Sequence, residues 1–334
     1  MQAIGKGIMI SRNIPATGYS IYVFDSIGKG LRTINRRGQG PGEYTSIAGL
    51  VALDEYNNEI FVNFSLGKKI LVYDLLGNFK RSIAFQGDVS SRYDFVAIFD
   101  RANLICHVRD TYFDSKIDAY TQTEGSLFWI LSKQDGSVTE EIQIPYEKRI
   151  DTRFVDPNGR GGTIDVWNSI PYNDSWLLLE PSSDTIYKVL PDYSITPFIA
   201  RTPSIQSMNP ERFLFPGVLT DHYYFMRVII KKDYDPDTNS FPAIDLMYDR
   251  QKKAIFEYVV YNDDFLTKRP VSMWNRLPDI TLINNEEIAF TERLEAYQIV
   301  EAYKNGQLKG KLKEIAAELD EEDNPVIMIA RNKK

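Results

Sequence analysis

One phrase of sequence occurs twice near the start of the chain. It consists of an apolar strand ending in an aromatic residue and an aspartate, a turn containing glycine, and a second strand. The first copy spans residues 21–34 and the second spans residues 70–83. Their aspartates, Asp25 and Asp74, lie 49 residues apart. Self-similarity at such a period is typical of folds built from repeated supersecondary units.

More degenerate copies of the phrase follow along the chain, at residues 128–144, 185–199, 245–258 and 297–306. Six copies in 334 residues average about 56 residues each, which fits a four-stranded blade with loop insertions. The sequence therefore predicts an all-β fold, a six-bladed β-propeller, in a single domain over residues 1–334. The alternative is a β-sandwich, which would not repeat one turn phrase at a long, nearly constant period.

The C-terminal region departs from the β pattern. Apolar residues recur with helical spacing between 305 and 320, at Leu308, Leu312, Ile315 and Leu319. A short apolar segment, Val326–Ala330, follows. We expect a short amphipathic helix and then a strand that joins the blade of Ile21–Asp25, closing the ring and covering its exposed edges.

Charge and composition exclude some partners. The net charge is −7, with 46 acidic and 39 basic residues and no extended basic cluster, so no nucleic-acid partner is expected. No apolar run reaches the length of a transmembrane segment, and no signal peptide is visible in the first 20 residues. Cys106 is the only cysteine, so no intrachain disulfide forms. We expect a monomer without a cofactor.

Three stretches carry a family resemblance: G-K-G-L-R-T-I-N-R-R-G-Q-G-P-G-E-Y at 28–44, Ser183–Val189 and Asp323–Met328. They resemble the six-bladed β-propeller proteins with NHL-like repeats that are abundant in Bacteroidetes, whose first blade ends in a G-x-G-P-G-E-aromatic loop. The resemblance implies a six-bladed ring and, because many members look like exported lipoproteins, a periplasmic or cell-surface location. This chain departs from the family ahead of Ile21, where the signal peptide, the lipobox cysteine and the first inner strand are not visible. A shortened N-terminal strand is therefore expected.

The glycine-rich loop in the first stretch is the first candidate binding element. It lacks the Lys-Ser/Thr of a phosphate-binding loop, and a strand follows it. Its glycines are expected to adopt positive φ while Pro41 fixes a turn. Connections of this kind lie on the propeller face where ligands usually bind, so five side chains are expected at the rim: Arg36, Arg37, Gln39, Glu43 and Tyr44.

A second set of candidate residues lies at strand ends in the C-terminal half: Arg201, His222, Arg227, Trp274 and Arg276. Arginine suits carboxylate or sugar-acid recognition, and an indole can stack on a sugar ring. The function that we predict is a non-catalytic binding or scaffold module, with a glycan, peptide or protein ligand on the face of the 36–44 loop. The alternative is a carbohydrate-active hydrolase or lyase using carboxylates and arginines at a central channel.

Catalytic and metal-binding patterns are weak. Cys106 and His107 are adjacent in an expected strand, so their side chains point to opposite faces and cannot form a dyad. Asp233, Asp235 and Asp237 alternate like the start of a calcium loop, but Thr238 occupies the position of the required glycine. We expect a polar hairpin loop there and no metal site.

Overall fold

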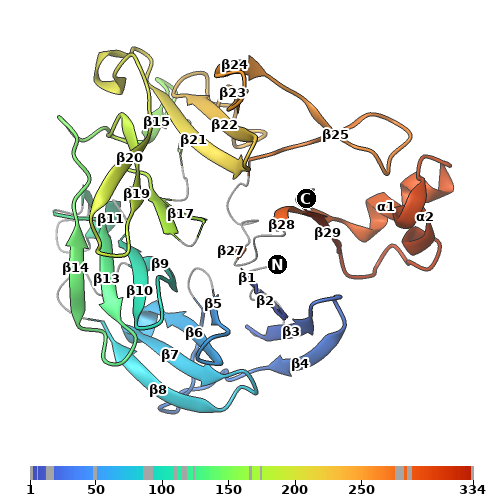
Figure 1. The fold of residues 1–334 in the computed structure, drawn as a ribbon, viewed down its shortest axis with the longest axis horizontal. Helices are drawn as coiled ribbons and strands as arrows, with labels where there is room; N and C mark the ends of the chain where they lie inside the picture. The colour runs from blue at the N-terminus through green and yellow to red at the C-terminus, as the bar shows by residue number, and fades with distance from the viewer. Residues whose placement is uncertain are drawn as a thin grey trace. The chain divides into compact units, whose positions relative to one another are not determined.

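The computed structural model of the chain describes residues 3–5, 7–12, 19–47, 51–85, 93–108, 111–114, 119–122, 125–164, 168–173, 175–274, 282–283 and 288–331. Among these residues the fold is all-β apart from two short α-helices and two single turns of 3₁₀-helix, Ser65–Gly67 and Ile205–Ser207 (Figure 1). The chain divides into two compact units. The first comprises residues 1–147, 167–200 and 281–285, and the second comprises residues 148–166, 201–280 and 286–334.

The first unit contains four sheets of successive strands. The first sheet has the order β27-β1-β2-β3-β4, with β1 (Ala3–Ile4), β2 (Ile8–Arg12), β3 (Ile21–Asp25), β4 (Gly30–Ile34) and β27 (Leu282–Ile283). The second contains β5 (Val51–Asp54), β6 (Glu59–Phe64), β7 (Lys69–Asp74) and β8 (Phe79–Ala84). The third contains β9 (Tyr93–Ile98), β10 (Asn103–Val108), β13 (Phe128–Ser132) and β14 (Val138–Ile142), with a hairpin of β11 (Thr111–Asp114) and β12 (Ala119–Gln122) between β10 and β13. The fourth contains β17 (Ser169–Tyr172), β18 (Ser175–Leu178), β19 (Thr185–Val189) and β20 (Ile195–Ala200).

The second unit contains one four-stranded sheet, three strand pairs and the two helices. The sheet comprises β21 (Arg212–Leu219), β22 (Tyr223–Ile230), β23 (Ala243–Asp249) and β24 (Ala254–Glu257). The pairs are β15 (Arg153–Val155) with β16 (Gly161–Thr163), β25 (Val260–Asn262) with β26 (Arg269–Val271), and β28 (Ile288–Leu294) with β29 (Val326–Arg331). The helices are α1 (Ala296–Lys304) and α2 (Gly310–Ala316). Every strand pairing is antiparallel except that of β1 with β27 among the described residues.

The repeated turn has one hydrogen-bond pattern in its first two copies. Oδ1 of Asp25 accepts hydrogen bonds from the backbone N–H groups of residues 27 and 29, and Oδ1 of Asp74 does the same for residues 76 and 78. Gly28 and Gly77 donate to the backbone carbonyl of the same aspartate and adopt φ of +87° and +85°. The aspartate and the glycine thus fix the turn locally, which explains why the phrase recurs in sequence.

Neighbouring sheets of the first unit meet through a repeated contact. Gly77 in the β7–β8 turn lies against Ile34 of β4, and Gly136 in the β13–β14 turn lies against Ile83 of β8. An arginine accompanies each contact, because Arg32 donates to the carbonyl of Leu75 and Arg81 donates to the carbonyl of Lys133. The first and second sheets therefore each pack their last strand against the turn of the sheet that follows.

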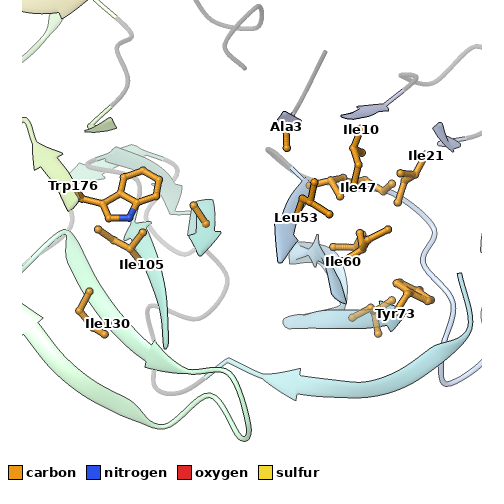
Figure 2. Packing of buried hydrophobic residues seen from close by; sticks show 14 of the residues in the cluster. Ala3, Ile10, Ile21, Ile47, Leu53, Ile60, Tyr73, Ile105, Ile130 and Trp176 are labelled. Carbon is orange, nitrogen blue, oxygen red and sulfur yellow. The ribbon is translucent and has the colours of Figure 1, made fainter. Parts of the chain in front are cut away.

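The largest core cluster lies within the first unit and draws on several sheets (Figure 2). Ile10, Ile60 and Ile105 come from three different sheets and are fully buried. Trp176 of the fourth sheet joins the same cluster. The alternation of apolar residues in these strands places one row of side chains in this common core.

A buried ion pair ties the second sheet to the third. Nζ of Lys133 lies 2.6 Å from Oδ2 of Asp54 and 2.5 Å from the backbone carbonyl oxygen of Asp100. The exposed fractions of the Lys133 and Asp54 side chains are only 5% and 3%. A charge so deeply buried is tolerated only with such partners.

Five of the six predicted strand–turn–strand copies are confirmed as the paired strands β3–β4, β7–β8, β13–β14, β19–β20 and β23–β24. The sixth is wrong, because residues 296–304 form α1. Its buried residues, Ala296, Ile299 and Val300, follow helical spacing, and Gly306 at φ +65° follows the helix end.

The two ends of the chain differ from expectation in their pairing. Two strands, β1 and β2, lie ahead of Ile21, and β2 pairs with β3, so the first sheet does not lack its inner strand as expected from the sequence. The expected helix is α2, in which Leu312 is buried, and β29 follows it. However, β29 pairs with β28. It does not join the sheet of β3, and strand β3 itself pairs with β2 on one side and with β4 on the other. The predicted pairing of Val326–Ala330 is therefore wrong.

Candidate functional site

The glycine-rich loop joins the edge strands β4 and β5 and is held by its own hydrogen bonds. The N–H of Gly40 donates to Oε2 of Glu43, and the N–H of Gly38 donates to the carbonyl of Tyr44. None of the loop's three glycines adopts positive φ, so that expectation is wrong. Their lack of a side chain instead lets the side chains of Glu43 and Phe79 approach the loop backbone closely. A methyl group at Gly38 would lie 2.0 Å from Oε2 of Glu43, and one at Gly42 would lie 2.6 Å from the Phe79 ring.

The side chains of this loop divide into exposed and structural ones. Arg36, Arg37 and Gln39 are all exposed. Arg36 is also structural, because its Nε donates a hydrogen bond to the carbonyl of Gly77. Tyr44 is fully buried, so it does not lie at an exposed rim as expected. Its hydroxyl donates to the carbonyl of Tyr19, and its ring meets that of Tyr73 edge-on. The loop is thus anchored in the core of the first unit.

The other predicted residues belong to the second unit. Arg201 donates from Nη1 to the carbonyl of Arg212. His222 is exposed in the β21–β22 turn, where its N–H donates to Oγ1 of Thr220. Arg276 lies outside the described residues. Of this set, the structure brings together Arg227 and Trp274.

Arg227 is the centre of the polar cluster that we take as the candidate site. It pairs directly across the sheet with Asp245 of β23, and its Nε and Nη2 each lie 2.6 Å from an oxygen of that carboxylate. The guanidinium also stacks on Trp274, with 4.8 Å from Cζ to the ring centroid. Exposed fractions of 22% for Arg227 and 32% for Asp245 leave both side chains accessible to a ligand. Two-pronged pairing and stacking fix the guanidinium in one orientation.

Backbone contacts set the position of Trp274. Val218 of β21 donates to the carbonyl of Met273, and Oγ of Ser272 accepts from the N–H of Trp274. Gly217 lies within the β-bulge of β21, and a methyl group there would lie 2.2 Å from the carbonyl oxygen of Met273. Neither Gly217 nor Asp245 was singled out from sequence. Bulges are frequent next to functional sites, and the Pro216-Gly217 pair inside an apolar strand is the sequence signal that could have marked this one.

Tyr258 borders the cluster. Its ring packs edge-on against Phe225, with centroids 4.9 Å apart. Burial, with a smaller contribution from the negative charge of Asp245, raises the pKa of Tyr258 from 10.0 to about 12. The phenol therefore stays neutral beside the Arg227–Asp245 pair over the ordinary pH range.

The raised pKa predicts a loss of stability at alkaline pH. The unfolded chain releases the Tyr258 proton near pH 10, whereas the folded chain holds it until about pH 12, so deprotonation favours unfolding within this window. Urea unfolding of the wild type and of Tyr258→Phe should show a smaller decline above pH 10 in the variant. Equal declines in the two proteins would contradict the burial of this phenol.

Other reactive groups are dispersed. Cys106 and His107 occupy opposite faces of β10, as predicted, because Cys106 lies in one core cluster while His107 packs on Phe128. Burial raises the pKa of the Cys106 thiol. In the 233–240 loop, the Asp235 carboxylate accepts hydrogen bonds from the Asp237 N–H and the Thr238 hydroxyl. Neither Asp233 nor Asp237 joins it in a metal-binding group, and no cluster of three or more potential metal ligands occurs in the described part of the chain.

Comparison with known proteins places the chain in a family. The family described as "Domain of unknown function (DUF4934)" matches residues 1–331. The chain belongs to this family. No curated protein matches it. None of the helices in the described ranges is long and apolar enough to cross a membrane.

Two solved structures share the fold with this DUF4934 chain. A putative exported protein of Bacteroides fragilis is 16% identical, with a TM-score of 0.59 and coverage of 100% of this chain and 92% of its own. A DUF4221 member of Bacteroides vulgatus is 12% identical, with a TM-score of 0.50, and the match covers 79% of this chain and 84% of the other. At such low identity the likeness concerns the fold alone. It agrees with the all-β architecture and with a largely uncharacterised family represented in Bacteroides.

Proposed function

We propose that this chain is a non-catalytic binding module on a six-bladed β-propeller, and that its ligand is a glycan bound at the Arg227–Trp274 cluster. Five meanders of successive antiparallel strands support the propeller, as does the repeated contact between the turn of one sheet and the last strand of the sheet before it. The β25–β26 and β28–β29 pairs supply the remaining blade, and pairing of β27 with β1 brings a late segment into the first sheet. The exported structural neighbour supports a periplasmic or cell-surface location.

The observation that carries this proposal is the orientation of Arg227 between Asp245 and Trp274. Sugar-binding sites combine an aromatic surface for the C–H face of a pyranose with planar polar groups for its hydroxyls. Here an indole, a guanidinium and a carboxylate are fixed together and remain partly exposed. A ligand thus meets groups that are already ordered, which lowers the entropic cost of binding.

The charge balance of the cluster favours a neutral glycan. Arg227 is already neutralised by Asp245 at 2.6 Å, so an incoming carboxylate would have to displace an existing two-pronged ion pair. A sugar hydroxyl can instead donate to Asp245 and accept from Arg227 without breaking that pair. Binding should therefore depend only weakly on salt.

The alternative of a carbohydrate-active hydrolase or lyase is less well supported by this geometry. A glycosidase needs two carboxyl groups on either side of the bond that it cleaves. Asp245 is held as an ion pair with Arg227, and the described contacts of the cluster include no second carboxylate facing it. The cluster is therefore better suited to holding a sugar than to cleaving it.

Calorimetric titration with a panel of neutral and acidic oligosaccharides tests the proposal. Trp274→Ala should weaken binding of the best neutral ligand by roughly 30-fold, and Trp274→Phe should lose less because an aromatic face remains. Tyr56→Ala is the matched control, because Tyr56 also stacks on an arginine, Arg101, at 3.9 Å, but in the first unit.

A second control distinguishes the two candidate binding sites, the Arg227–Trp274 cluster and the glycine-rich loop. Arg37→Gln changes an exposed arginine of the 36–44 loop and should leave the affinity unchanged. Weakened binding in Arg37→Gln together with unchanged binding in Trp274→Ala would move the site to the glycine-rich loop and overturn the proposed location.

A further inference from the structure

The sheet of β21–β24 ends in an edge strand that differs from the other edge strands. Ile255 and Phe256 of β24 have exposed fractions of 60% and 41%, and Val259, just after the strand, is exposed as well. In β24 two adjacent exposed residues are apolar, one on each face, whereas the exposed apolar residue of β8 (Phe79) or of β14 (Val138) is followed along the strand by charged or polar residues such as Lys80 and Glu140. Charged side chains on an edge strand normally prevent pairing with another chain.

Both faces of this sheet carry hydrophobic rows that run to the edge. On one face, Phe225, Met247 and Phe256 lie opposite one another across β22, β23 and β24. On the other face, Tyr224, Tyr248 and Ile255 form the equivalent row. Burial decreases along the first row from Phe225 to Phe256. A further strand would continue both rows, and cross-strand neighbours of this kind stabilise a sheet.

The charges at the ends of β24 are self-complementary. Lys253 directly precedes the strand, and Glu257 is its last residue. In an antiparallel pairing of two copies centred on Ile255, Ala254 faces Phe256, and Lys253, the last residue of the preceding turn with a φ of +51°, lies at the strand end next to Glu257 of the other copy. The two-fold symmetry of such an interface repeats the Lys–Glu pair on both sides.

We propose that β24 pairs with β24 of a second copy of this chain, forming a symmetric dimer through a continuous sheet. This inference goes beyond the proposed ligand site and replaces the monomer expected from sequence. Two four-residue strands bury less surface than the roughly 1,200 Å² of a stable interface, so the dimer should be weak and concentration-dependent.

Sedimentation velocity over a concentration series tests this proposal on the full chain. The wild type should shift from monomer to dimer as its concentration rises, and Phe256→Lys should remain monomeric. The matched control is Val138→Lys, which places the same charge at an exposed apolar position of another edge strand, β14, and should dimerise like the wild type. A wild type that stays monomeric throughout, or equal loss in both variants, would overturn the proposal.

Charge reversal tests the register. Lys253→Glu and Glu257→Lys should each weaken association by about tenfold, because each places like charges opposite one another twice. The double variant, Lys253→Glu with Glu257→Lys, restores opposite charges and should recover the wild-type dimerisation constant. Circular dichroism confirms that each variant is folded. A double variant as weak as the single ones would contradict the proposed pairing.

Discussion

Replacing Lys133 by methionine is expected to lower the free energy of unfolding by about 3–5 kcal/mol, because the substitution leaves Asp54 as a buried charge without its cation. The loss should also loosen the attachment of the second sheet to the third, since Asp54 ends β5 of the second sheet and Lys133 follows β13 of the third. Urea unfolding followed by circular dichroism measures the change.

A matched control is available at the surface. Lys304 and Glu321 form an equally short ion pair of 2.6 Å, but both side chains are largely exposed. Lys304→Met should leave the unfolding midpoint close to that of the wild type, since solvent already screens this pair. Similar midpoints for Lys133→Met and Lys304→Met would show that the Lys133–Asp54 pair is not buried in solution.

Replacing Gly136 by alanine is expected to cost about 3 kcal/mol. The residue adopts φ +76°, which alone costs a residue with a side chain about 1–2 kcal/mol. In addition, the new methyl group would lie 2.8 Å from the backbone carbonyl oxygen of Ala84 and 2.5 Å from the Ile83 side chain. The contact between adjacent sheets would therefore have to open.

Gly28→Ala separates these two effects. Gly28 has a similar φ of +87°, yet the nearest atom to an added methyl group is the flexible end of Met9 at 3.9 Å. Gly28→Ala should therefore lower the free energy of unfolding by about 1 kcal/mol, from the strained backbone conformation alone. Equal destabilisation in the two variants would mean that the β13–β14 turn does not pack against β8 as described.

The parts of the fold that could be predicted from sequence are those set by local chemistry. The Asp-x-x-Gly turns carry their own hydrogen bonds at Asp25 and Asp74, so a short stretch of residues suffices to specify each one. The first two confirmed copies follow from this, and in the other three an aspartate of the turn (Asp135, Asp192 or Asp249) likewise accepts a hydrogen bond from the backbone N–H two residues later. The sixth failed because residues 297–303 read as apolar and aromatic, while the burial of Ile299 and Val300 depends on α1 packing in three dimensions.

The candidate site was only partly predictable for a similar reason. Arg227 and Trp274 were selected individually by residue type and by their position near strand ends. The partnership of Arg227 with Asp245 depends on the register between β22 and β23, which no local pattern fixes. The close approach that requires Gly217 depends on a segment more than 50 residues later in the chain.

The glycine-rich loop shows the limit of reasoning by residue type. Its glycines suggested positive φ, whereas the structure uses them to let Glu43 and Phe79 approach the backbone. Tyr44 likewise has the hydroxyl of a binding residue, but the hydroxyl donates to the carbonyl of Tyr19 within the core. The approach of Phe79 to Gly42 and the hydrogen bond of Tyr44 to Tyr19 both depend on residues outside the loop.

The central claim is that the Arg227–Trp274 cluster binds a glycan without transforming it. The most direct test is to titrate the protein to saturation with the best-binding oligosaccharide while following tryptophan fluorescence. After prolonged incubation, the ligand is recovered and analysed by mass spectrometry. The account predicts a saturable change that is lost in Trp274→Ala, together with an intact oligosaccharide. Cleaved product from the wild type, absent with Asp245→Asn, would contradict it and establish the hydrolase or lyase alternative.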